Sequence, residues 1–262
     1  MQVRVITCAT LSLLSLSVHA GTVMETVTRD LNNPAANGTT LITTHAQDGR
    51  MRVEAKPGDS VMIFKDDVIY NIDKKDKTYV AMDRELMKQM ADQINPALKA
   101  MREQLAKMPP EQRAQVEKMM NARMGDGMNG EPQQIRTTGR KGQAAGRACT
   151  YAEARQGGTL TDEFCVVSGG ALQGSQDLLV AARKLSALVQ EMFSNLDAPW
   201  LKELANRQAD YEKIGGVPVL SRHYADGNPV SETTLQTIRA ESLPASLFDV
   251  PAGFKKKDMM AR

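Results

Sequence analysis

Apolar residues recur every three or four positions along residues 84–108, which is the spacing of one face of an α-helix. The stripe consists of Met87, Met90, Ile94, Leu98, Met101, Leu105 and Met108. Pro96 lies inside the stripe and predicts a kink or a split, and Pro109 and Pro110 predict its end. A second apolar side follows, with Val116, Met119, Met120 and Met124. The pattern therefore predicts a methionine-rich helical hairpin over residues 84–124.

Apolar and polar residues alternate instead in the segments before and after this hairpin, as expected for half-buried strands. In the stretch from Met51 to Ala55, for example, Met51, Val53 and Ala55 alternate with Arg52 and Glu54. Short, evenly spaced turns separate six such segments, which indicates an antiparallel meander rather than βαβ units. The six segments are Val23–Leu31, Thr39–His45, Met51–Ala55, Val61–Phe64, Val68–Ile72 and Thr78–Met82. Further strands are predicted over 134–167, 217–224 and 230–241.

Helical spacing returns after the second group of strands. Ser175 is a plausible N-cap, and the apolar residues that follow it are Leu178, Ala182, Leu185, Val189, Met192 and Leu196. A shorter helix is expected after Asp197, with Trp200 near its start. We therefore predict one α+β domain over residues 21–262: a curved antiparallel sheet, forming an open half-barrel, covered by helices.

The first twenty residues have the features of a signal peptide. Arg4 precedes an apolar run, and Val18-His19-Ala20 is a small-x-small cleavage signal before Gly21. The run is too short to span a bilayer comfortably. Cys8 lies far upstream of the cleavage site, which argues against a lipid-anchored precursor. The expected location is therefore the periplasm, with a soluble mature chain.

Two cysteines remain after residue 20, Cys149 and Cys165. An even pair in an exported protein indicates a disulfide, and two free thiols are the alternative. Each cysteine is eight positions from Gly157 in a Gly-containing hairpin loop, so we expect the two to face each other across an antiparallel pair.

Charge and motif content exclude several classes of function. Without residues 1–20 the chain has 32 basic and 31 acidic residues, too small an excess for a nucleic-acid binder. His45 and His223 are the histidines of the mature chain, and no G-x-S-x-G turn, H-E-x-x-H or Cys-x-x-Cys motif accompanies them. We therefore predict no enzyme, no catalytic residues, no metal site and no cofactor, and we interpret both histidines as structural.

Three segments carry a family resemblance: residues 62–73 (MIFKDDVIYNID), 216–219 (GVPV) and 247–254 (LFDVPAGF). Together they resemble a bacterial exported family known as domain of unknown function 4412. That family is similar to the periplasmic lipoprotein-carrier (LolA-like) fold, in which helices cover a curved antiparallel sheet and acyl chains lie between them. The resemblance implies this fold and this compartment rather than a reaction.

Thioether side chains are unbranched and adaptable, so the stripe from Met87 to Met108 could form the wall of a cavity for an apolar ligand. The alternative is that it fills a core. Met120, Met124 and Met128, spaced by four, could bind Cu(I), although no histidine accompanies them. Gly125, Gly127 and Gly130 would allow such a lid to hinge.

The sequence thus favours a non-enzymatic periplasmic carrier that holds an acyl chain or another apolar molecule between its sheet and a helical lid. The other hypothesis is an envelope chaperone or interaction module that uses the hairpin on partner proteins. It draws on residues 108–113 (MPPEQR), which resemble the turn entering a helix in small periplasmic helical-hairpin chaperones.

Overall fold

The computed structural model describes residues 20–32, 38–124, 133–196 and 214–258, without the side chains of 117, 118 and 120–124. Twelve strands and three α-helices lie in this part of the chain. The strands are β1 (Gly21–Asp30), β2 (Thr39–Gln47), β3 (Arg50–Lys56), β4 (Ser60–Lys65), β5 (Val68–Asp73), β6 (Thr78–Met82), β7 (Gln134–Ala144), β8 (Arg147–Gln156), β9 (Thr159–Val167), β10 (Val217–Ala225), β11 (Asn228–Glu241) and β12 (Lys255–Lys256). The helices are α1 (Arg84–Lys107), α2 (Pro110–Met124) and α3 (Gln176–Ser194).

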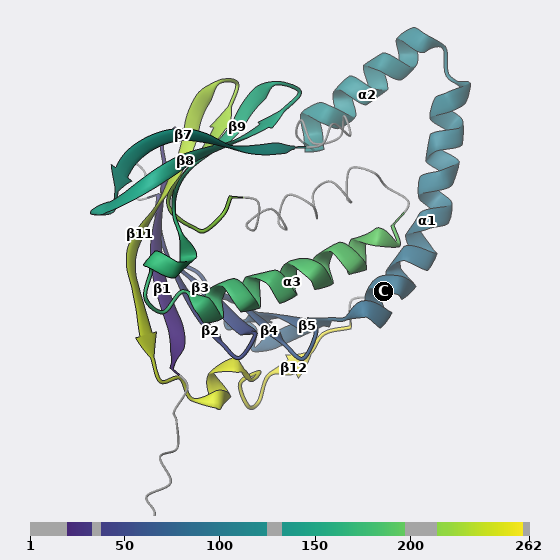
Figure 1. Cartoon of the computed structure of the whole chain (residues 1–262). Helices are drawn as coiled ribbons and strands as arrows, with labels where there is room; N and C mark the ends of the chain where they lie inside the picture. Colours follow the sequence, from purple (N-terminus) through teal and green to yellow (C-terminus); the bar gives the residue numbers. More distant parts are fainter. Residues whose placement is uncertain (1–19, 33–37, 125–132, 197–213, 259–262) are drawn as a thin grey trace, which may run out of the picture.

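All the described strands belong to one open sheet, in the order β12-β6-β5-β4-β3-β2-β1-β11-β10-β9-β8-β7. Neighbours are antiparallel except β12 and β6, which pair in parallel. Figure 1 shows the sheet bending around α3, with β4 and β5 below the helix and β7 to β9 above it. The predicted α+β class with a curved, mostly antiparallel sheet is confirmed.

Each face of the sheet has its own apolar core. On the concave face, α3 packs on Met51, Phe64 and Ile69 through Ala181, Leu188 and Met192. On the convex face, Val23, Ile63 and Ile72 pack under Leu243 and Phe248 from the segment after β11. Ile63 and Phe64 are adjacent in β4 and serve opposite cores because successive strand side chains alternate between faces.

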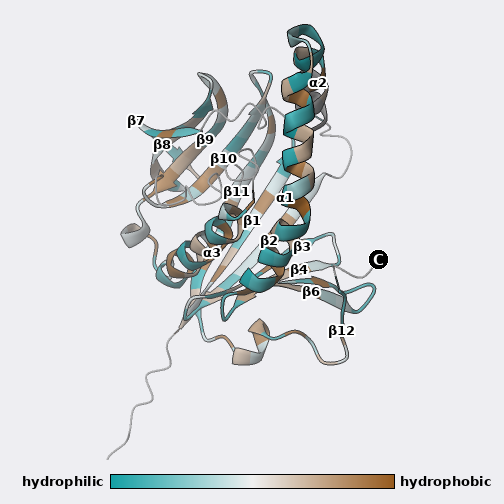
Figure 2. Ribbon diagram, turned by 90° about the vertical axis from the view of Figure 1, so that its right-hand side faces the viewer, coloured by the Kyte–Doolittle hydropathy of each residue, from teal (hydrophilic) through white to brown (hydrophobic). Residues whose placement is uncertain are grey.

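The hairpin forms as two helices, but it does not cover the sheet. Asp83 begins α1 by accepting a hydrogen bond from the Leu86 amide at 2.8 Å. Met87 and Ala91 are the described residues of α1 that are buried, and α1 contacts α3 near its start. Beyond that point α1 extends away from the sheet, as Figure 2 shows.

Helix α1 continues through Pro96, where we expected a kink or a split. Pro96 and Asp92 are exposed, so water can bond the carbonyl that proline leaves without a partner.

Cys149 and Cys165 form a disulfide as predicted, with 5.4 Å between their Cα atoms. They are not directly opposite, because the loop contains both Gly157 and Gly158, and a bulge follows at Ala154 and Arg155. Cys165 therefore pairs with Tyr151, and Cys149 lies two positions further along the same face of β8.

Ser175 directly precedes α3, but its side chain does not cap the helix. Its hydroxyl donates instead to the carbonyl oxygen of Gly169 at 2.6 Å, which closes the turn before the helix.

Several predicted features lie outside the described residues: residues 1–19 of the signal peptide, the glycines of the hinge, Met128 and the helix at Trp200. The side chains of Met120 and Met124 are also outside them. Among the described helices, none is both long and apolar enough to cross a bilayer.

The α3–sheet contact should dominate stability. Replacing Leu188, which is 2% exposed, with alanine should lower the free energy of unfolding by about 2–5 kcal/mol, because it leaves a cavity in the concave core. The matched control is Val180→Ala on the exposed side of the same helix, which should change it by less than about 0.5 kcal/mol. Urea denaturation measures both. Equal effects of the two substitutions would contradict the assignment of this face.

Candidate functional site

A cavity of about 490 Å³ lies between α3 and the concave face of the sheet. Its apolar wall comes from one side of α3 and from the strands beneath it, with Met24, Ile42, Phe164, Leu178, Leu185, Val189 and Leu235. Its polar wall comes mainly from β9, β10 and β11, with Asp162, Ser221, His223, Ser231 and Thr233. The volume is in the range of small-molecule sites, and the lining combines a large apolar area with few polar groups.

Strand register brings the polar residues together. His223 in β10 pairs with Asp162 in β9 on one side and with Ser231 in β11 on the other. Two residues along, Ser221 pairs with Phe164 and Thr233. Because side chains two positions apart share a face, these residues form two adjacent rows on the concave side.

Asp162 is held by two hydrogen bonds. Its Oδ1 lies 2.9 Å from Nδ1 of His223, and its Oδ2 accepts a hydrogen bond from Nε2 of Gln133 at 3.0 Å. The His223 side chain is 54% exposed, so the pair lies at the mouth of the cavity rather than in its interior. A carboxylate has about four lone-pair positions, so Asp162 can still accept a hydrogen bond from a ligand.

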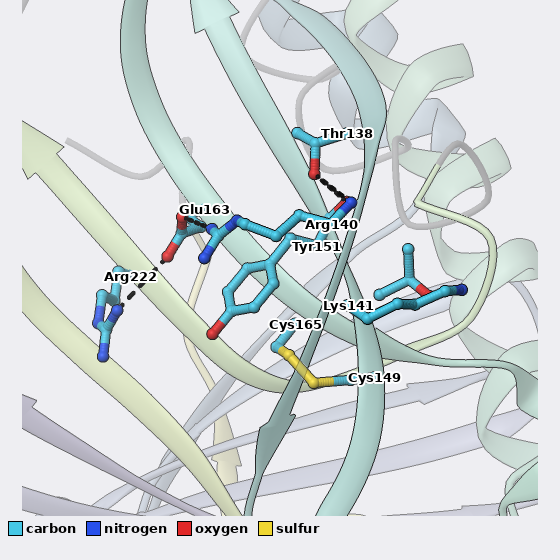
Figure 3. The surroundings of a disulfide bond; sticks show 9 residues. Thr138, Arg140, Lys141, Cys149, Tyr151, Glu163, Cys165 and Arg222 are labelled. Carbon is cyan, nitrogen blue, oxygen red and sulfur yellow. Dashed lines mark hydrogen bonds and ion pairs between the residues drawn. A yellow bond between two sulfur atoms is a disulfide. The ribbon is translucent and has the colours of Figure 1, made fainter.

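A row of charges occupies the other face of the same strands. Glu163 is paired with Arg140 from β7 and lies 3.4 Å from Arg222, which also binds Glu232 at 2.8 Å. Figure 3 shows Arg140 reaching across the ring of Tyr151 to Glu163, beside the disulfide. The Arg140 guanidinium lies 3.4 Å from the centre of that ring, which is a cation–π contact.

Gly142 leaves the room that the Tyr151 ring needs, because a Cβ at this position would clash with the ring.

Arg222 borders the cavity, but its guanidinium is paired with Glu232 and Glu163 in this row of charges. The hydrogen bond to Glu232 is the largest cause that raises the pKa of Arg222 above its ordinary value.

The seven residues of the predicted binding stripe lie elsewhere. None of them lines the cavity. Met87 and Met90 pack in the concave core, which agrees with the alternative interpretation of the stripe for these two residues. Ile94 and Met101 are exposed, and Leu98, Leu105 and Met108 are half-buried. Ligand binding by the stripe stays a prediction.

The sequence interpretation named His223 but took it as structural, and it did not single out the neighbours of His223 on the cavity wall. The available signal was the alternation Ser221, His223 before the turn at Asp226-Gly227 and Ser231, Thr233 after it, which marks a polar face on a hairpin. Within the part of the chain that the structure describes, no group of three or more His, Cys, Asp or Glu residues is placed to hold a metal ion.

No protein-family model matches the sequence, and no curated protein matches it. Among solved structures, the chain is similar to an uncharacterized conserved protein from Thermus thermophilus, with a TM-score of 0.46 and 8% identity over 92% of this chain and 91% of the other. It is also similar to PNGF-II in two crystal forms, with TM-scores of 0.38 and 0.34 and 9% identity. The match to PNGF-II covers 91% of this chain but 31% of that protein. At these scores the similarity carries no argument about family or function.

His45, the other histidine, lies in β2 and not at the cavity. Its Nδ1 is buried and has no hydrogen-bond partner among the described residues. Burial is the largest cause that lowers the pKa of His45 below 6.5, because it disfavours the charged form. Glu54 opposes this shift and Arg52 adds to it.

This shift predicts a pH dependence of stability. Because the folded pKa lies below the unfolded one, the unfolded chain takes up the proton first, and the free energy of unfolding should fall as pH drops below about 6.5. The loss should level off below the folded pKa. Urea denaturation of the protein and of His45→Gln between about pH 7 and pH 5 measures it. The free energy of unfolding of the variant should decline less steeply with falling pH. Equal slopes for the two proteins would show that His45 does not cause the decline.

Proposed function

We propose that this protein is a non-enzymatic, periplasmic binding or carrier protein that holds an acyl chain in the cavity between α3 and the curved sheet. The observation that supports it best is the cavity itself, with its long apolar wall and its polar mouth. Apolar pockets of this size with a few convergent polar groups are typical of small-molecule sites.

The arrangement has the physical features that an acyl chain requires. Burying an apolar chain removes about 25 cal/mol of unfavourable hydration per Å² of its surface, so a mainly apolar wall supplies affinity without specific contacts. Leu185 and Val189 from α3 face Ile42 and Leu235 from the sheet across this space. The helix that covers the ligand in this proposal is α3, rather than the predicted lid over 84–124.

The sequence adds the compartment and the proposed relatives. The predicted signal peptide, the disulfide and the resemblance to the exported family of lipoprotein-carrier (LolA-like) fold all favour a periplasmic protein. The large curved antiparallel sheet with a helix on its concave face is compatible with such a carrier. Lipid extraction and mass spectrometry of protein purified from the periplasm would identify a bound acyl chain.

Filling the cavity should weaken binding. Ala182 lines it from α3, so Ala182→Trp should weaken the binding of a fluorescent fatty acid at least about tenfold while the protein remains folded. Ala187→Trp introduces the same ring on the exposed side of the same helix and should leave affinity unchanged. Fluorescence titration measures affinity, and circular dichroism measures folding. Undiminished binding by a folded Ala182→Trp variant would exclude this cavity as the acyl site.

A second candidate function is supported by the exposed hairpin. Ile94 and Met101 on α1 and Met119 on α2 are large apolar residues with 39%, 37% and 57% of their surface exposed. Exposed apolar residues on projecting helices are a means of contacting other proteins, which fits an envelope chaperone or interaction module.

The two candidate functions can be separated by one variant. Replacing Ile94, Met101 and Met119 with glutamine should reduce the suppression of aggregation of an unfolded client protein, because it removes the apolar contacts. The same variant should keep its affinity for the fluorescent fatty acid, because none of the three residues lines the cavity. Light scattering of the client measures the first effect. Full suppression by the variant would reject the hairpin as the client-binding element.

A further inference from the structure

The cavity changes from polar to apolar along the strands, and this gradient gives a ligand an orientation. The outermost row of the concave face contains Asp162, His223 and Ser231, and the next contains Phe164, Ser221 and Thr233. Further inward, Leu235 and Ile42 lie on either side of Thr26, so the lining becomes mainly apolar. A bound amphiphile would therefore place its tail beneath α3 and its head group at the mouth, between β9 and β11.

The charges at the mouth decide which head group fits. Arg222 is the one arginine or lysine among the described lining residues. Its guanidinium is bound to Glu232 and Glu163 on the opposite face, because Arg222 alternates with Ser221 and His223 along β10. Among the described lining residues, the acidic group on the concave side of the mouth is thus the carboxylate of Asp162, beside the His223 ring.

The mouth also contains hydroxyl groups, which can bind an uncharged head group. Ser221, Ser231 and Thr233 each offer one donor and two acceptor positions, which suits hydroxyl or ester groups. A head-group hydroxyl can donate to Asp162, whereas an anionic head group would meet a like charge, and the arginine of the described lining is already paired. Like charges about 5 Å apart in a partly hydrated site repel by the equivalent of roughly tenfold in affinity.

We propose that the cavity selects single-chain amphiphiles with an uncharged, hydroxyl-bearing head group, such as monoacylglycerols, over free fatty acids of the same chain length. This inference rests on the proposed acyl-binding function. Asp162 is the residue that determines the selectivity, and His223 together with Gln133 holds its carboxylate in place.

The test compares monododecanoylglycerol with dodecanoate at pH 8, where the fatty acid is ionised. Both are added below their critical micelle concentrations and compete with a fluorescent acyl probe on the full-length protein. The monoacylglycerol should bind about tenfold tighter. Equal affinities, or tighter binding of dodecanoate, would overturn the proposed selectivity and leave the acyl-binding function standing. Failure of both lipids and of the probe to bind would overturn the function itself.

The variant Asp162→Asn tests whether Asp162 causes the selectivity between the two lipids. It removes the charge while its amide oxygen can still accept from His223, so dodecanoate affinity should rise severalfold and monoacylglycerol affinity should change little. Asp226→Asn makes the same change of charge in the exposed turn between β10 and β11 and should leave the ratio as it is. A ratio that Asp162→Asn does not change would remove Asp162 as the determinant, and the comparison of the two lipids on the unmodified protein tests the selectivity independently.

Discussion

The packing of α3 on the concave face of the sheet is the contact on which the rest of the structure depends. One side of the helix, with Ala181, Leu188 and Met192, is buried against the first half of the sheet. The adjacent side, with Ala182, Leu185 and Val189, borders the cavity. A single helix thus both packs in the concave core and forms one wall of the cavity, whose other walls come from the strands.

This division explains which features could be predicted from the sequence. The meander, the hairpin and α3 were predictable because periods of two and of three to four residues report local geometry directly. The period of an apolar stripe does not report what packs against it. Met192 and Leu185 belong to the same predicted stripe, yet Met192 is buried in the core and Leu185 lines the cavity. Ile94 and Met101 continue the stripe of Met87, yet they are exposed.

Strand bulges set a second limit on prediction. Register shifts lie between Ala154 and Arg155 and between Pro218 and Leu220, and another follows His223. Each adds a residue that simple counting from a turn does not reveal. This is why the cysteines were expected in direct opposition, and why the meeting of Asp162, His223 and Ser231 could not be derived from their positions. Their chemistry was visible in the sequence, but their proximity depends on register.

The central pairing of β1 with β11 has a consequence for how this chain folds. The first six strands contact their sequence neighbours and can assemble early, whereas Gly21 meets Glu241 from the opposite end of the chain. Closing a loop of that length is entropically unfavourable before its contacts form, so we expect this step to limit the folding rate. Until it occurs, β1 presents an unpaired edge to which another chain could add. The partly folded molecule is therefore open to self-association along β1 until β11 covers that edge.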